Sequence, residues 1–345
     1  MNARVIALMS AQHGLVTRKQ AIEAGMSADQ IDRLVRTKVW TAVRRGVYAE
    51  TSYVATLTTV RAKRMLADRA ASMRIGAKHH MSHHSAAYLL DLPVLQEPEP
   101  VTHVTRMGIV GSHHRHGVKH HRAPFRPELV VERAGLLCLG PARTAADISR
   151  EHGYRHGLVA ADSAMRNGTP RSELDEVAAD MPSWPHVTVV RDVFASASPD
   201  TDSVGETLAR ELVTELGFGV PEVQFGLTAD GRTAWCDLRL GRHVIEFDGR
   251  VKYQRVEEGG LAPDSPDEVV WFEKRRQDWV CGFKLGMSRL VWDDFFGLAR
   301  ERAKERVTRE YLDTCQRFGT DPADLAPFRP RGPRPRPRPL PPRAA

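Results

Sequence analysis

Three carboxylates on two neighbouring predicted strands are the residues of this sequence best suited to chemistry. Asp237 lies in a strand predicted over 234–240, and Glu246 and Asp248 lie in and just after a strand predicted over 243–247. Side chains alternate between the two faces of a strand, so Glu246 and Asp248 share one face of an otherwise apolar run. Buried carboxylates without partners are costly, and two close together repel unless a cation or a proton joins them. Mg²⁺ (or Mn²⁺) would supply that cation, because it binds through one or two carboxylates plus a substrate phosphate and activates an attacking water.

Each of these acids also has a structural alternative. Asp237 and Glu246 can instead form ion pairs with nearby basic residues, and Asp248 can open the turn that it makes with the following glycine. The basic residues in reach are Arg239, Arg250 and Lys252.

A fourth acid, Glu206, lies in the first turn of a helix predicted over 204–216. It follows Ser203 by three residues, which is the spacing of a capping box, in which the glutamate carboxylate accepts a hydrogen bond from the N-cap amide. The sequence is therefore compatible with two roles for the Glu206 carboxylate, as a metal ligand or as a helix cap.

The pattern D-x8-E-x-D, with S-V-G-E before it and E-F-D-G around its second half, resembles the PD-(D/E)xK nuclease superfamily. Within that superfamily it looks like the DUF559 and very-short-patch-repair endonuclease-like branch. The resemblance covers about 203–296, including E-K-R-R-Q-D and S-R-L-V-W-D-D-F. It implies a central mixed sheet flanked by helices and Mg²⁺-dependent cleavage of phosphodiesters.

Residue by residue, the resemblance implies that Asp237 is the first motif acid, Glu246 the second, and Glu206 the acid carried by the first helix. The sequence departs from the family where a motif lysine is expected, because Asp248 stands there. Lys252 would supply a displaced ammonium group; otherwise the third acid would support a second metal ion or a water.

The helix predicted over 268–281 carries two further cations. Lys274 and Arg275 can bind a scissile phosphate. Alternatively, Lys274 forms an ordinary surface ion pair with Asp278, four residues on.

Three short helices and a basic hairpin at the N-terminus predict a winged helix. The helices are expected over 3–12, from an N-cap at Thr17 to Ala24, and after an N-cap at Ser27. The hairpin is expected over 39–49. If the third helix enters the major groove, its outward side chains meet bases and phosphates, and the arginines of the wing meet the backbone. These DNA-contacting residues are Gln30, Arg33, Arg36, Arg44 and Arg45.

The segments G-L-V-T-R-K-Q-A-I-E-A-G-M-S, I-D-R-L-V and R-R-G-V-Y-A resemble the N-terminal domain of AbiEi-type antitoxins. The resemblance continues to about residue 180 through S-H-H-S-A-A-Y-L-L-D-L, H-H-R-A-P and P-A-R-T-A-A-D-I. These antitoxins are winged-helix proteins of type IV toxin–antitoxin systems that repress their own operons. The resemblance implies DNA and a cognate toxin protein as partners.

Ten of the fifteen histidines lie between His79 and His121. His79, His80, His83 and His84 have a helical i, i+4 spacing that suits a metal site. No cysteine and no clear carboxylate partner accompanies them, so the pattern favours a weakly basic, pH-sensitive surface near DNA over a metal site.

Composition limits the alternatives. A chain of 345 residues predicts two or three domains. The sequence contains no run of about 18 apolar residues, so we expect no membrane-spanning helix. The N-terminus does not resemble a signal peptide. The four cysteines have no zinc-knuckle spacing, and we expect a cytoplasmic protein that keeps them reduced.

The net charge of +7 is concentrated at the two ends of the chain. Residues 1–50 carry a net +4 and residues 327–345 a net +6, which leaves −3 for the remainder. Basic ends suit a polyanion such as nucleic acid. The Pro/Arg-rich tail favours extended polyproline II and either tracks phosphates or serves as a solubilising end.

We therefore predict a multidomain α+β and α/β protein. The expected parts are a winged helix (1–55), a mixed α+β middle domain (56–200), a restriction-endonuclease-like domain (201–300), a C-terminal helix (301–320) and a disordered tail (321–345). The expected function is Mg²⁺-dependent endonuclease-like action on DNA. The alternatives are a non-enzymatic regulator or antitoxin with a degenerate nuclease-like domain, and an antitoxin that acts only through a partner protein. A homodimer on paired half-sites is also expected.

Overall fold

The computed structural model describes residues 2–249 and 266–332. The chain divides into two compact units, Met1–Ala197 and Ser198–Ala345. In the part of the chain that the structure describes, the strands form three sheets of three, six and four strands, so the predicted mixed α/β multidomain architecture is observed. Within the described part of the chain, no helix is long and apolar enough to cross a membrane.

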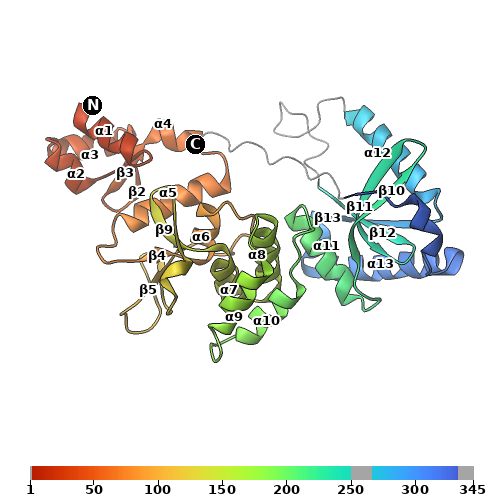
Figure 1. Cartoon of the computed structure of the whole chain (residues 1–345). Helices are drawn as coiled ribbons and strands as arrows, with labels where there is room; N and C mark the ends of the chain where they lie inside the picture. The colour runs from red at the N-terminus through yellow and green to blue at the C-terminus, as the bar shows by residue number, and fades with distance from the viewer. Residues whose placement is uncertain (1, 250–265, 333–345) are drawn as a thin grey trace. The chain divides into compact units, whose positions relative to one another are not determined.

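The first unit begins with a winged helix (Figure 1). Both predicted N-caps are present, and each belongs to a capping box, Thr17 with Gln20 and Ser27 with Gln30. A third strand of the small sheet was not predicted, because three residues are too few to show an alternating pattern. The sheet order is β1-β3-β2. The elements are α1 (Ala3–Ala11), β1 (Leu15–Thr17), α2 (Arg18–Glu23), α3 (Ala28–Arg36), β2 (Trp40–Arg44) and β3 (Val47–Glu50).

A six-stranded sheet follows, in the order β6-β7-β5-β4-β9-β8. We expected a strand over 108–110 and one long strand over 128–139. The first expectation is wrong, because glycines at 108 and 111 adopt positive φ and form a turn. The second segment is a hairpin that reverses at Ala134-Gly135, both with positive φ. The strands are β4 (His80–Met81), β5 (Thr102–Arg106), β6 (His113–Arg115), β7 (Val118–Arg122), β8 (Val130–Arg133) and β9 (Leu136–Leu139).

Helices complete the first unit, and four of them form a bundle, drawn in green in Figure 1. Its core is rich in alanine and valine, and these small side chains let α7 and α8 approach closely. The helices are α4 (Thr51–Thr56), α5 (Val60–Ser72), α6 (His83–Leu89), α7 (Pro141–His152), α8 (Tyr154–Arg166), α9 (Arg171–Ala179) and α10 (Val187–Ser196).

The second unit is a four-stranded mixed sheet in the order β10-β11-β12-β13. The first three strands are antiparallel, and β13 runs parallel to β12. Phe247 of β12 packs against Gly205 of α11, whereas Val244 belongs to a core cluster with Val280 of α12. Helices therefore flank both faces of this sheet, as predicted. The elements are α11 (Val204–Glu215), β10 (Glu222–Ala229), β11 (Arg232–Leu240), β12 (His243–Asp248), α12 (Pro266–Cys281), β13 (Gly286–Val291) and α13 (Gly297–Phe318).

Gly157 of α8 packs against Ser149 of α7, and this contact gives a test of the packing. A Cβ added at Gly157 would lie 2.2 Å from Oγ and 2.9 Å from Cα of Ser149. We expect Gly157→Ala to destabilise the first unit by about 1–3 kcal/mol, because overpacking outweighs a helix-propensity gain of up to about 1 kcal/mol. Urea denaturation measures this loss. Gly76→Ala is the control, because its added Cβ meets no atom within 4 Å; equal losses in both variants would contradict the packing argument.

Candidate functional site

Helix α3 presents the side chains that sequence analysis assigned to DNA. Gln30, Arg33 and Arg36 are exposed, whereas Ile31 is buried in the core of the winged helix. The side-chain oxygen of Gln30 accepts a hydrogen bond from the Ser27 amide at 2.9 Å, so this oxygen belongs to the helix cap. The Gln30 amide nitrogen and the two guanidinium groups remain the donors suited to bases and phosphates.

A charged contact fixes the orientation of α3. Arg18 of α2 donates to both carboxylate oxygens of Asp32 at 2.6 and 3.0 Å. The same guanidinium donates to the hydroxyl of Tyr48 in β3 at 3.3 Å. The hydrogen bonds from Arg18 lower the pKa of Asp32, so this carboxyl is ionised at neutral pH. One arginine therefore joins α2, α3 and the wing.

The two wing arginines differ. Arg45 is exposed, whereas Arg44 is half-buried and donates to the backbone carbonyl of His116. Both line a cavity of about 770 Å³ that contains five arginines and no acidic residue. Burial, with Arg74 nearby, lowers the pKa of Arg44. A cavity lined in this way suits an anion. Its lining residues are Arg44, Arg45, Ala71, Arg74, Ile75, Gly76, Ala77, Arg106, Arg115, His116, Val118 and His120.

In the second unit, the predicted ligand Glu246 is buried and forms an ion pair with Arg276 of α12. The guanidinium lies 3.0 Å from Oε1 and 3.3 Å from Oε2 of Glu246. Burial alone would lower the pKa of Arg276, but the negative charge of Glu246 outweighs it and raises that pKa. The pairing alternative weighed for Glu246 thus occurs with a different arginine, because Arg239 pairs with Glu222 of β10.

Asp248 lies beside a second arginine. A guanidinium nitrogen of Arg289 is 3.5 Å from Oδ2 of Asp248 and another is 3.7 Å from Glu273. Glu273 in turn approaches Arg276 at 3.6 Å. Acids and arginines therefore alternate between β12, α12 and β13.

Asp237 and Glu206 have different surroundings. The paired register of β11 and β12 ends at Leu238 and Ile245, and the next side chain, Asp237, accepts the amide hydrogen of Phe247 at 2.8 Å. Glu206 accepts hydrogen bonds from the Asp202 amide at 2.8 Å and the Ser203 hydroxyl at 2.9 Å, and from the side-chain amide of Gln224 at 2.7 Å. Ser203 is the N-cap of α11, as predicted, because its hydroxyl accepts the Glu206 amide at 3.1 Å. The backbone amide bonded to the Glu206 carboxylate in these contacts is that of Asp202, whereas the capping-box prediction named that of Ser203.

The four acids proposed for Mg²⁺ do not fit a ready-made metal site. Among the side chains that the structure describes (residues 2–249 and 271–332), there are two groups of three or more His, Cys, Asp or Glu ligand atoms within 4.8 Å of one another, and both are centred on histidines of the first unit and contain none of these four acids. The Mg²⁺ (or Mn²⁺) site at Asp237, Glu246, Glu206 and Asp248 stays a prediction. Lys252 and Arg250 fall outside the described residues.

The predicted phosphate-binding residues on α12 are solvent-facing. Lys274 and Arg275 are both exposed. The Arg275 guanidinium lies 4.7 Å from the centre of the Trp271 ring, which is a cation–π contact. Their role toward a phosphate stays a prediction.

A family model described as "Transcriptional regulator, AbiEi antitoxin" matches residues 3–51. Residues 3–51 are an AbiEi antitoxin-type N-terminal domain. The match spans α1 to β3, so it covers the AbiEi-type winged helix with Arg33, Arg36 and both wing arginines.

Two curated relatives match a longer part of the chain than the family model does. Two uncharacterized proteins of Mycobacterium tuberculosis are each 25% identical to this chain over 196 residues: MT2308 of strain CDC 1551 / Oshkosh and Rv2248 of strain ATCC 25618 / H37Rv. The alignments cover 54% of this chain and 65% of each relative, so the chain spans less than two thirds of these curated relatives. The crystal structure of RV2827C protein from Mycobacterium tuberculosis is similar at 16% identity and a TM-score of 0.37, over 57% of this chain and 77% of that one.

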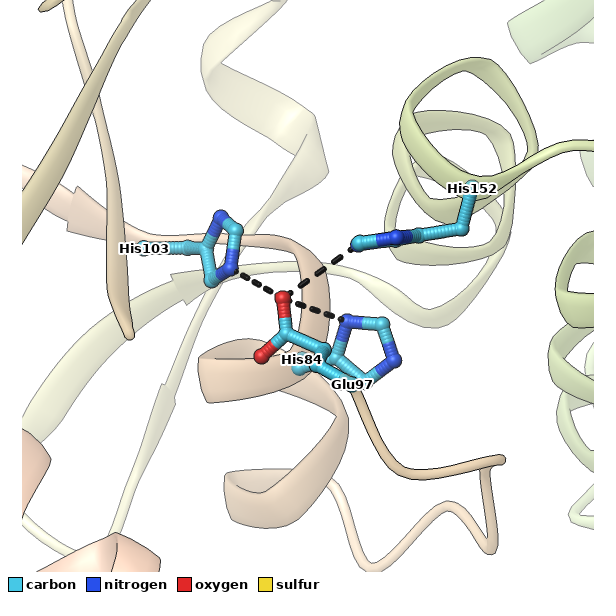
Figure 2. Close-up of side chains that lie close together, drawn as sticks. All are labelled: His84, Glu97, His103 and His152. Carbon is cyan, nitrogen blue, oxygen red and sulfur yellow. Dashed lines mark hydrogen bonds and ion pairs between the residues drawn. The ribbon is translucent and has the colours of Figure 1, made fainter. Parts of the chain in front are cut away.

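A cluster of histidines around one glutamate, outside the AbiEi-type domain, was not predicted from the sequence. The side chains come from α6, the loop after it, β5 and the last residue of α7, and their rings converge on one carboxylate oxygen (Figure 2). Oε1 of Glu97 lies 2.6 Å from Nε2 of His103, 3.3 Å from Nε2 of His152 and 3.5 Å from Nδ1 of His84.

We expected the ten histidines between His79 and His121 to lie on the surface, and this expectation is wrong for half of them. His80, His83, His84, His103 and His121 are buried, because α6 and the strands of the large sheet carry them into the interior. Only His84 of the helical quartet takes part in the group around Glu97. The signal that could have found the site, a carboxylate near the histidines, was present at Glu97, but no local spacing links it to His103 and His152.

The charges of this cluster follow from burial. Burial lowers the pKa of His84 to about 3, so this imidazole is neutral at physiological pH. Burial would raise the pKa of Glu97, but the neighbouring His103 and His152 side chains outweigh it and hold the pKa well below its usual range. The cluster thus combines neutral imidazole and ionised carboxylate.

Arg276→Ala tests the pairing of Glu246. Removing one partner of a buried ion pair costs about 3–5 kcal/mol, and because the Arg276 side chain is 30% exposed we expect about 2–3 kcal/mol. Denaturation followed by tryptophan fluorescence measures the loss. The control is Arg275→Ala on the same helix, which removes only a surface cation–π contact of about 1 kcal/mol or less. The same loss in both variants would contradict the assigned role of Arg276.

Proposed function

We propose that this chain is a DNA-binding transcriptional regulator whose helix α3 enters the major groove. The match of residues 3–51 to AbiEi-type regulators carries the proposal. Two observations support the proposal. Arg33 and Arg36 are exposed on α3, and this helix is capped at its start and held by the contact between Arg18 and Asp32. In winged-helix docking, side chains at these positions contact base edges and phosphates.

The DNA backbone would follow the arginine-lined cavity beside the wing. Arg45 is exposed at this cavity, and Arg74, Arg106 and Arg115 extend its positive charge. Phosphate contacts of this kind supply affinity and register, whereas α3 supplies sequence preference. A cognate toxin protein and a second copy of the chain on a neighbouring half-site extend the proposal.

Arginine substitutions on α3 test the proposal. We expect Arg33→Ala and Arg36→Ala to weaken binding to a duplex selected from a random library by about 10- to 100-fold, the effect of losing one base contact. Fluorescence anisotropy measures the affinity. Arg133→Ala is the control, because it removes an equal charge from an exposed position in β8. Equal weakening by Arg133→Ala would indicate a general charge effect and would refute recognition by α3.

A contact between the wing and the DNA backbone would affect the salt dependence of binding. Because a phosphate contact releases counterions, Arg45→Ala should reduce the slope of log affinity against log salt by about 0.9. Sequence preference should stay as in the unaltered protein. An unchanged slope would contradict a backbone contact at the wing.

A second proposal is an Mg²⁺-dependent phosphodiesterase activity of the second unit. Its support is the order α11-β10-β11-β12-α12-β13 with a parallel final strand pair, together with three acids on the adjacent strands β11 and β12. The described side chains do not gather these acids into one ligand group, so we derive no catalytic step from them.

Cleavage assays decide the second proposal. Plasmid, linear and single-stranded DNA are incubated with Mg²⁺, Mn²⁺ or EDTA. We expect metal-dependent cutting that Asp237→Ala and Glu246→Ala abolish, while the exposed turn variant Asp230→Asn retains it. Absence of cutting by the unaltered chain, or cutting that survives both alanine substitutions, would rule out this site.

A further inference from the structure

We propose that His84, Glu97, His103 and His152 bind one divalent transition-metal ion, Zn²⁺ in the first instance. The ion would cross-link α6, the following loop, β5 and α7 within the first unit. The proposal concerns residues outside the AbiEi-type domain and does not depend on the function proposed above.

The distances between the ligand atoms suit a tetrahedral ion. With bonds of about 2.0–2.1 Å to nitrogen and oxygen, the ligand atoms of tetrahedral Zn²⁺ lie about 3.3 Å apart. Two of the three contacts of Glu97 Oε1 already have this length, at 3.3 Å to His152 and 3.5 Å to His84. The third, 2.6 Å to His103, has to open by less than 1 Å. All four ligand atoms lie within 4.8 Å of one another.

Two of the ligand atoms are buried without another use. Nδ1 of His84 and Nε2 of His152 make no hydrogen bond within the described residues, although each faces Glu97 (Figure 2). The His84 side chain is fully buried. A buried nitrogen without a partner loses its hydration, and a metal ion would restore the lost interaction.

Neighbouring groups orient the imidazoles for coordination. The Nε2–H of His84 donates to the carbonyl of Leu95 at 3.0 Å, which leaves the lone pair of Nδ1 facing Glu97. On the other side, Nδ1 of His103 lies 2.9 Å from Nε2 of His121, so a proton on Nδ1 leaves Nε2 free to coordinate. Metal-binding histidines characteristically donate their second ring nitrogen in this way, and the partner fixes the tautomer.

The ligand set selects the class of ion. Mg²⁺ and Ca²⁺ prefer oxygen ligands, whereas three imidazoles and one carboxylate suit Zn²⁺ and its first-row neighbours. Four protein ligands in a buried position leave no open coordination place, which is the arrangement of structural zinc sites. The ion would therefore stabilise the first unit.

A second histidine group suits a metal less well. It consists of His83, His103 and His121, and it shares His103 with the first group. The rings of His83 and His121 stack with centroids 3.8 Å apart and planes inclined by 19°. Stacked rings direct their nitrogen lone pairs side by side instead of toward one point, and this group contains no carboxylate to balance the charge of the ion.

Metal analysis of the full-length chain tests the proposal. After purification, metal removal and titration with Zn²⁺, we expect one equivalent bound per chain and a raised Tm. Glu97→Gln, which keeps the shape of the side chain, and His103→Gln should weaken binding on the order of 100-fold and abolish the Tm shift. The control is His114→Ala, an exposed histidine of the same segment, which should bind like the unaltered chain.

A measurement on the unaltered chain guards against variants that fail to fold. X-ray absorption at the zinc edge should show a four-coordinate nitrogen and oxygen shell with imidazole scattering. A sulfur-containing shell, a shell without imidazole, or equal loss of Zn²⁺ binding in His114→Ala would overturn the site. So would a folded, unaltered chain that binds no Zn²⁺, in which case Glu97 serves only as a hydrogen-bonded partner of the histidines.

Discussion

The cost of burying a carboxylate is the constraint on which both units depend. An ionised carboxyl removed from water needs a cation or several hydrogen-bond donors, because its lost hydration amounts to several kcal/mol. Glu97 meets three imidazoles, Glu246 meets Arg276, and Glu206 meets the start of α11 and Gln224. For each acid at least one partner comes from a different element, so satisfying the charge also fixes how two elements pack.

Features set by near neighbours in the chain could be predicted from the sequence. The N-caps at Thr17 and Ser27 were predicted from their residue types and their places before the helices, and they locate the starts of α2 and α3 correctly. The hairpin at Asp230-Gly231 and the strands of the second unit follow from turn chemistry and alternation in the same way. The reversal at Ala134-Gly135 was not predicted, because alanine seldom adopts positive φ.

The sequence predicted that acidic side chains of the candidate site are buried, but it did not predict their partners, which are distant in sequence. Alternation along β12 correctly indicated that Glu246 is buried and needs a partner. The partner expected for Glu246 was a metal ion or a basic residue close in sequence, whereas its partner in the structure is Arg276 of α12, 30 residues further along the chain. Likewise, the histidines were visible as a cluster in sequence, but Glu97 and His152 join His84 and His103 only through the fold of the sheet and the bundle. Contacts between side chains that are distant in sequence produce no local sequence pattern from which they could be predicted.

The histidine cluster and the wing are connected through one sheet. His103 lies in β5, which pairs in parallel with β7 at Lys119. The turn before β7 contains His116, whose carbonyl accepts the hydrogen bond from Arg44 of the wing. An ion held by His103 would therefore brace the strand against which β7 is registered, and β7 in turn places the turn that the wing contacts. If the cavity binds phosphate as proposed, Arg44, Arg45 and Arg115 would have to keep fixed separations, and the rigidity of this sheet would set how well they are preorganised for an anion. The proposed metal centre would then support the proposed DNA binding indirectly, because it would hold the sheet that carries the basic cavity, whereas sequence preference would come from α3.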